Sequence, residues 1–255
     1  MAGVLTEDGT TGVREARTAR MWFGGAVPTT ATRLELQRIA THVAARRRHD
    51  VTGRFGLRAT PGGLGTPAFG PDDAIEVVRL TATALVHEQG SSLRVVPYSG
   101  ARLRDLASIV RVDLAEPFSA GHDTPEVGDP DAALSVDESD AAALGEWLDL
   151  GWRALDALGA EVGDPNPVQL WPEHFDASLV AAVGAGPDDR CGFGVSLGDG
   201  GHEEPYLYVG PWQPARPGDP AYWNAEFGAL LPASSVASVG DALAFFREGR
   251  DRLMG

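Results

Sequence analysis

The chain has 255 residues and a formal net charge of −15, and all 21 of its basic residues are arginine. The lack of lysine excludes a Schiff-base lysine and the phosphate-binding lysine of a Walker A loop. The acidic balance argues against nucleic-acid partners and anionic membrane surfaces, because binding to both rests on basic side chains. It is compatible with neutral or cationic small molecules as partners.

Apolar residues make up 43% of the chain and charged residues 22%, which is typical of a globular protein. The lone cysteine, Cys191, excludes an internal disulfide framework and a cysteine-rich zinc site. We therefore expect a cytoplasmic protein in which Cys191 is a small buried hydrophobe. The sequence has no run of about 18 apolar residues and no signal-peptide pattern, so we expect no membrane span.

The first half of the chain predicts a helix followed by strands. Residues 1–28 are polar and dotted with glycine, and we expect them to form a flexible N-terminal tail. Residues 29–112 form the first α+β half. Its helix has capping-box spacing at Thr32 and Glu35 and ends at arginines 46–48, which we expect to be solvated. Strand patterns follow in VTGRFGLRAT, AIEVVRL, TALVHEQ and SSLRVVPY, and then a short helix in ARLRDLASIV.

The second half repeats this order after an acidic connection. Residues 113–137 carry several acidic residues and prolines, which indicates a linker or a long excursion. Residues 138–255 form the second α+β half, with a helix over about Glu138–Leu158 capped by Asp137. Strand patterns follow in VQLWPEH, DASLVAAV, RCGFGVSL and PYLYVGP, and Ser238 caps the last helix.

A short pattern recurs in the two halves. F-G-x5-G-G-x3-P begins at Phe55 and again at Phe193, and each copy has a long amphipathic helix before it and strands and a helix after it. The alternative is chance, in a chain with 32 glycines and 18 prolines. We predict an α+β fold with antiparallel sheets, curved or barrel-like, flanked by three to four helices. The two helix–strands–helix units are expected to be an internal duplication packed as one compact unit.

Two histidine–carboxylate patterns are the candidate polar site. His174 and Asp176 are two residues apart in WPEHFD, and His202 and Glu204 are two residues apart in GHEEPY. Such pairs point to the same side of an extended chain. If the two segments are neighbours, these four residues are candidate ligands for a divalent metal, namely zinc, iron or manganese. They are equally candidate catalytic residues, since a histidine held by a carboxylate transfers protons near neutral pH. Ordinary polar loops produce the same short patterns.

Aromatic residues concentrate in the same half. Trp171, Tyr206, Tyr208 and Trp212 are candidate ligand-binding walls of a pocket. An ordinary core with tyrosine hydroxyls at its rim has the same composition. Two functions therefore stay open: a small-molecule-binding protein or enzyme with its pocket in the C-terminal half, and a non-catalytic interaction or scaffold protein. Convergence of the four polar residues in one concavity favours the first.

The C-terminal motifs carry a family resemblance. PVQLWPEHFD, followed by FGVSLGD, EEPYLYVGPW and YWNAEFGA, resembles an uncharacterised bacterial family, a domain of unknown function. VTGRFGLRATPGGLGTP is similar to the first half of the same family, so the resemblance covers most of the chain beyond Thr29. It implies a soluble cytoplasmic protein and assigns no catalytic residue.

Overall fold

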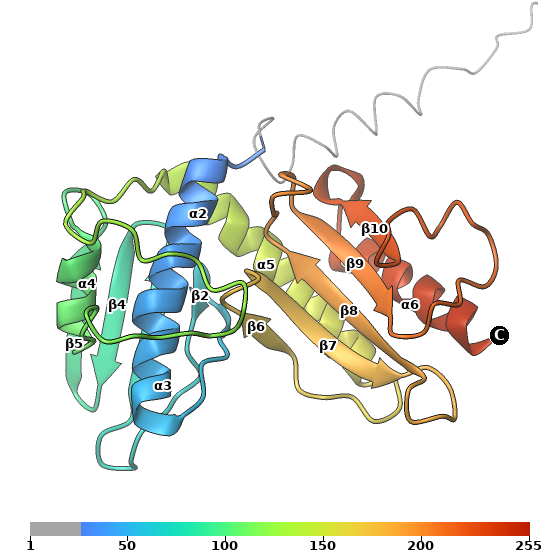
Figure 1. The fold of residues 1–255 in the computed structure, drawn as a ribbon, viewed down its shortest axis with the longest axis horizontal. Coiled ribbons are helices and arrows are strands. Elements are labelled where there is room, and N and C mark those ends of the chain that lie inside the picture. Colours follow the sequence, from blue (N-terminus) through green and yellow to red (C-terminus); the bar gives the residue numbers. More distant parts are fainter. Residues whose placement is uncertain (1–26) are drawn as a thin grey trace, which may run out of the picture.

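The structure is a computed structural model that describes residues 27–255, so the predicted tail lies almost entirely outside the described residues (Figure 1). The first half consists of one long helical rod, five strands and a short helix. These elements are α2 (Thr30–Ile39), the π-helical η1 (Ala40–Ala45), α3 (Arg46–Thr52), β1 (Arg58–Thr60), β2 (Gly63–Gly65), β3 (Glu76–Thr81), β4 (Ala84–Gln89), β5 (Ser92–Pro97) and α4 (Leu103–Ile109).

The second half has the same order of elements. They are α5 (Glu138–Gly159), β6 (Gln169–Trp171), β7 (Asp176–Ala182), β8 (Arg190–Ser196), β9 (Tyr206–Pro211), β10 (Ala229–Pro232), the 3₁₀ turn η2 (Ala233–Ser235) and α6 (Val239–Met254). Each half therefore contains a helix, a five-stranded meander and a second helix, which confirms the predicted α+β class with two similar units.

Two open antiparallel sheets result, in the orders β1-β2-β3-β4-β5 and β10-β9-β8-β7-β6. Their inner edges meet where Leu57 and Leu170 exchange backbone hydrogen bonds of 2.8 and 2.9 Å. In the described chain neither sheet closes into a barrel. The strand order makes β1 the counterpart of β6, and β4 the counterpart of β9.

The repeated glycine pattern does not mark equivalent positions in the two halves. Gly62 lies in the turn between β1 and β2 and Gly63 begins β2, whereas Gly200 and Gly201 lie in the loop between β8 and β9. Those two connections have different places in the meander. The duplication is therefore supported by the order of elements, and not by the alignment of the two glycine pairs.

Helix starts follow local capping chemistry. Asp137 and Ser238 cap α5 and α6 as predicted. The first helix begins earlier than the sequence suggested, because Thr29 is its N-cap and accepts a hydrogen bond from the backbone of Thr32. The rod ends at Gly53, whose φ of 71° is a left-handed conformation that glycine adopts without strain.

The expectation that arginines 46–48 are solvated is wrong. Arg47 Nη2 lies 2.5 Å from Glu76 Oε1, and the Glu76 side chain is only 3% exposed. His87 and Arg111 also contact this carboxylate, at 3.1 and 3.0 Å. Glu76 shares the face of β3 on which Val78 and Leu80 are buried, so the helical rod has to supply positive charge there.

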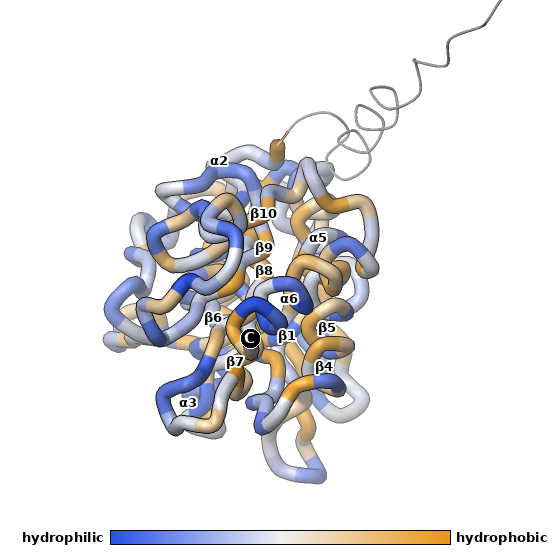
Figure 2. Tube along the Cα trace, turned by 90° about the vertical axis from the view of Figure 1, so that its right-hand side faces the viewer, coloured by the Kyte–Doolittle hydropathy of each residue, from blue (hydrophilic) through white to orange (hydrophobic). Residues whose placement is uncertain are grey.

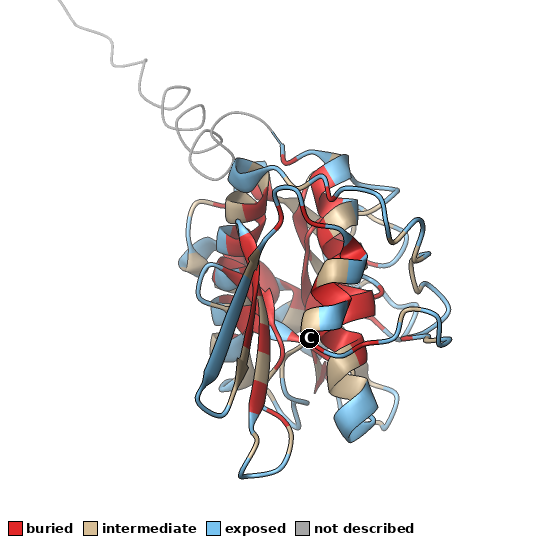
Figure 3. Cartoon of the chain, turned by 90° about the vertical axis from the view of Figure 1, so that its left-hand side faces the viewer, coloured by how far each residue is buried: buried red, intermediate tan, exposed pale blue. Residues whose placement is uncertain are grey.

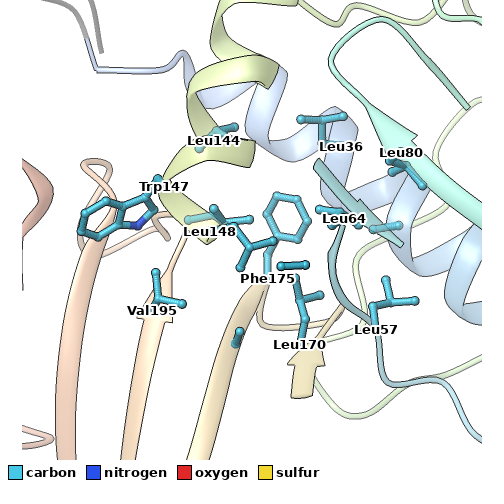
Figure 4. Packing of buried hydrophobic residues seen from close by; sticks show 14 of the residues in the cluster. Leu36, Leu57, Leu64, Leu80, Leu144, Trp147, Leu148, Leu170, Phe175 and Val195 are labelled. Atoms are coloured by element: carbon cyan, nitrogen blue, oxygen red, sulfur yellow. The ribbon is translucent and has the colours of Figure 1, made fainter. Parts of the chain in front are cut away.

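One hydrophobic core joins the halves. Figure 4 shows side chains of α2 and α5 pointing towards residues of both sheets, with Phe175 at the centre. Helix α5 approaches β8 closely at Gly151, where an added Cβ would lie 2.5 Å from the Cβ of Val195. Buried residues gather between helices and sheets in Figure 3, and hydrophilic segments follow the outer loops in Figure 2. Among the described helices, none combines the length and hydrophobicity that a membrane crossing requires.

Candidate functional site

The open face of the second sheet carries the candidate site. Side chains alternate along a strand, so Leu179, Val195 and Leu207 face the core. Asp176, Ser196 and Tyr206 are paired across β7, β8 and β9 and occupy the opposite face. A cavity of about 260 Å³ opens on that face; its lining residues are His174, Asp176, Ser196, Asp199, Tyr206, Tyr208, Gly210 and Phe227.

The floor of the cavity is a tyrosine–carboxylate pair. The phenol ring of Tyr208 lies across β8 over Gly194, where a Cβ would come within 2.2 Å of the tyrosine Cζ. The tyrosine hydroxyl reaches β7 in this way and donates a hydrogen bond to Asp176 Oδ2. Asp176 Oδ1 is buried and has no hydrogen-bond partner among the described residues. The sheet thus holds a carboxylate with one oxygen unsatisfied.

This pair holds its protons more tightly than free side chains do. Burial raises the pKa of the Asp176 carboxyl, and the hydrogen bond from Tyr208 and the proximity of His174 only partly offset that effect. Burial and the neighbouring Asp176 raise the pKa of the Tyr208 phenol well above its usual value. Tyr208 therefore stays a hydrogen-bond donor, and Asp176 can exchange a proton closer to neutral pH than an exposed aspartate.

Asp199, in the loop between β8 and β9, is the second acidic residue of the cavity. Its Oδ1 accepts hydrogen bonds from the backbone N–H groups of Gly201 (2.7 Å) and His202 (2.8 Å). Its Oδ2 accepts one from the Tyr206 hydroxyl at 2.5 Å. Burial raises the pKa of Asp199, but these hydrogen bonds outweigh burial and lower it overall. The glycine pair therefore shapes a turn that fixes a charged carboxylate beside the cavity.

Three aromatic rings surround the opening. The ring centroids of Tyr206 and Tyr208 are 6.3 Å apart. The ring of Phe227, from the connection between β9 and β10, lies 6.3 Å from Tyr206 and 6.2 Å from Tyr208. The three centroids thus form a nearly equilateral triangle.

The acidic connection reaches the same place from the first half. In Figure 1 this segment passes in front of the helical rod, and Arg38 anchors it by donating to the carbonyl of Val127 at 2.9 Å. Asp123 Oδ2 then lies 3.4 Å from His174 Nδ1 and 3.1 Å from His122 Nε2. Residues 113–137 thus supply the carboxylate that accompanies the cavity's histidine.

The structure brings together four of the residues predicted from the sequence. His174, Asp176, Tyr206 and Tyr208 all line the cavity. Strand alternation within β9 places Tyr206 and Tyr208 on one face, as their spacing predicted. His174 lies in the turn before β7, next to Phe175 with a φ of 55°, so turn geometry and not strand alternation places it in the lining. The fifth residue that matters, Asp199, was missed, although its position before a glycine pair is typical of an aspartate that caps a turn.

The other predicted residues lie outside the cavity lining. The His202 ring packs against Tyr206 with centroids 5.4 Å apart, and Glu204 accepts a hydrogen bond from the backbone of Ser234 at 2.7 Å. Trp171 Nε1 donates to Ser178 Oγ at 3.1 Å. Trp212 is 59% exposed. His202 and Glu204 separate because they lie in irregular chain before β9, where the alternation of a strand does not apply.

The predicted donor set does not fit a zinc, iron or manganese centre. Within residues 27–255, no group of three or more histidine, cysteine, aspartate or glutamate side chains is placed to hold a metal ion. Glu204 is directed to Ser234 rather than towards His174 and Asp176. We derive no chemistry through a metal at this site.

A larger cavity, of about 640 Å³, lies between the β1–β2 hairpin and helix α5. All of its acidic and basic groups are exposed to solvent, namely Arg58, Glu146, Asp149, Arg153 and Asp156. Such groups are satisfied by water. The smaller cavity is the stronger candidate, because it contains a buried carboxyl group with one oxygen that has no hydrogen-bond partner among the described residues.

Comparisons with protein-family models, with curated proteins and with solved structures find no match to this chain. The family resemblance of the C-terminal motifs therefore stays a prediction. Any assignment of function rests on the geometry of the cavity.

Proposed function

We propose that this protein binds a small molecule in the cavity on the open face of the second sheet. The observation that carries the proposal is Asp176 Oδ1, a buried carboxylate oxygen without a hydrogen-bond partner within residues 27–255. Leaving such a group unsatisfied costs about 1–3 kcal/mol, which other interactions of the fold have to offset. A ligand that donates to Asp176 removes this cost, and the aromatic walls bury its apolar part.

His174 and Asp176 stay candidates for acid–base chemistry on the bound molecule. A carboxyl group whose pKa is raised by burial, with a histidine beside it, is a frequent feature of active sites. The alternative function, a scaffold or interaction protein, gives no reason for an unsatisfied aspartate beneath three aromatic rings. We place the protein in the cytoplasm, in keeping with its single, buried cysteine.

A ligand screen with a matched pair of variants tests the proposal. Asp176→Asn removes the cavity's carboxylate, and Asp188→Asn removes the same charge from the exposed β7–β8 hairpin at the other end of the sheet. The thermal unfolding midpoint is measured with a library of cationic, neutral and anionic small molecules. Each shift in the midpoint is calculated relative to the same variant without ligand. We expect ligands that stabilise the wild type and Asp188→Asn but not Asp176→Asn. If no compound of any charge shows this dependence on Asp176, the scaffold function is favoured instead.

A further inference from the structure

The shape of the aromatic wall narrows the chemistry of the ligand. The centroids of Tyr206, Tyr208 and Phe227 lie 6.2–6.3 Å from one another. A positive charge above the middle of this triangle lies within about 6 Å of all three centroids, the range in which aromatic faces attract cations. The planes of Tyr206 and Phe227 are 23° apart, and Tyr208 lies at 56° and 79° to them, so the three rings line one point of the cavity at different angles. An ammonium group at that point is within reach of all three.

The hydrogen bonds of the two tyrosines strengthen this preference. Tyr206 donates to Asp199 and Tyr208 donates to Asp176, so both hydroxyl protons are already used. A phenol that donates to a carboxylate gains electron density, which makes its ring a better partner for a cation. The same hydrogen bonds leave the cavity with few donors for an anionic ligand.

The charged residues of the cavity also favour a cationic ligand. Asp176 and Asp199 lie on β7 and on the β8–β9 loop, and both belong to the lining. Two basic groups lie nearby: His174 Nδ1 is 3.4 Å from Asp123 Oδ2, and the buried Arg33 is attracted by Asp199 and Glu203, although its Nε has no hydrogen-bond partner among the described residues. Arg33 is not among the lining residues. Asp176 Oδ1, which has no hydrogen-bond partner among the described residues, remains as an acceptor for a donor group on the ligand, and the charge of the carboxylate attracts a cation whether or not its nitrogen carries an N–H.

We propose that the ligand is a small organic cation, an amine or a methylated ammonium compound held by the three rings and by Asp176. This inference rests on the proposed function and names its ligand class. The cavity volume of about 260 Å³ suits a head group of this kind rather than a nucleotide or a peptide. Gly194 makes room for the Tyr208 ring that forms the floor, and Gly210 is one of the lining residues.

A pair of isosteric probes tests the inference directly. Choline and 3,3-dimethylbutan-1-ol have nearly the same shape, but only choline carries a charge. Titration calorimetry on the full chain, at mildly alkaline pH, is expected to show choline binding about tenfold or more tightly than the alcohol. Asp176→Asn should abolish the preference. Phe227→Leu, which keeps an apolar side chain, should weaken choline binding about tenfold and leave the alcohol unaffected.

Trp212→Leu is the matched control for the aromatic variant, because Trp212 is exposed and lies outside the cavity lining. Its choline affinity should equal that of the wild type. Thermal unfolding of every variant shows that the fold is retained.

The outcomes separate the inference from the proposed function. Equal binding of the two probes overturns the cation preference but leaves a small-molecule site. No choline binding up to millimolar concentrations also overturns it; a neutral or anionic ligand that still depends on Asp176 then preserves the proposed function alone. The alternative ligand in that case is a neutral carbonyl compound that accepts a hydrogen bond from the protonated carboxyl of Asp176. If no ligand of any charge depends on Asp176, both proposals fail.

Discussion

Tyr208 and Gly194 are paired across β9 and β8, and the tyrosine ring occupies the space that a side chain at position 194 would need. This relationship lets the Tyr208 hydroxyl reach Asp176 on the far strand. The glycine is therefore part of the site, although it carries no functional group.

Gly194→Ala should displace the Tyr208 ring, because the new Cβ would lie 2.2 Å from Cζ of Tyr208. We expect a loss of about 1–3 kcal/mol in the free energy of unfolding from this overpacking, and loss of Asp176-dependent ligand binding. Gly192→Ala is the control on the same strand, since its Cβ would meet only the Gly210 carbonyl oxygen, at 3.7 Å. Urea unfolding and calorimetry compare the two, and equal effects would contradict this role for Gly194.

Asp176→Asn should stabilise the ligand-free protein at neutral pH. Burial raises the native pKa of Asp176 above its unfolded value, so the native state binds this proton more tightly. Protonated Asp176 contributes stability that is fully present below its unfolded pKa. This stability is lost as the pH rises through the raised native pKa. The amide avoids the cost of a buried charge, and we expect a gain on the order of 1 kcal/mol, or about 2–4 °C in Tm.

The gain from Asp176→Asn should shrink as the pH falls, because the wild-type carboxyl is then protonated and neutral in both states. Tm measured between mildly alkaline and acidic pH checks this trend, with Asp188→Asn as the exposed control. A variant that is less stable than the wild type at every pH would show that the carboxylate is structural rather than held for a ligand.

Binding of an ammonium ligand should release protons. A cation favours the ionised form of Asp176, so its affinity should rise as the pH rises through the raised pKa of the free protein. Asp199 already keeps its charge, because hydrogen bonds lower its pKa. Calorimetry in buffers with different ionisation enthalpies measures the proton count, which should vanish in Asp176→Asn.

Local chemistry in the sequence predicted the class of the fold and part of the site. Caps at Asp137 and Ser238, and apolar alternation in the strands, depend on neighbours a few residues away. The i, i+2 spacing of Tyr206 and Tyr208 placed both on one face for the same reason. These features are visible without knowing how the strands pair.

Strand pairing and long-range contacts decide the rest. Asp176, Ser196 and Tyr206 form a row only because β7, β8 and β9 pair in one particular register. Asp123 reaches His174 by a path across the helical rod that no short pattern encodes. The glycine pairs matched in sequence but occupy different connections, because any tight turn selects glycine.

The arginine cluster at the end of the first helix was misjudged for the same reason, and it gives a further prediction. Glu76 on β3 accepts hydrogen bonds from Arg47, His87 and Gln89, and lies 3.0 Å from Arg111. Glu76→Gln leaves buried positive charge without its partner and should lower the free energy of unfolding by about 3 kcal/mol or more.

Asp131→Asn is the exposed counterpart, since Asp131 pairs with Arg104 at 2.7 Å but is 49% exposed. Its cost should be much smaller than that of Glu76→Gln, because solvent screens an exposed ion pair. Burial raises the pKa of Glu76, but the hydrogen bonds from Arg47 and His87 and the charges of Arg47 and Arg111 outweigh it and lower the pKa overall. The stability from Glu76 is therefore present above the usual glutamate pKa and is lost as the pH falls through the native value. Denaturant unfolding at neutral pH and at about pH 3 should show the gap between wild type and Glu76→Gln closing in acid. A gap that is constant with pH would mean that the variant acts through packing and not through charge.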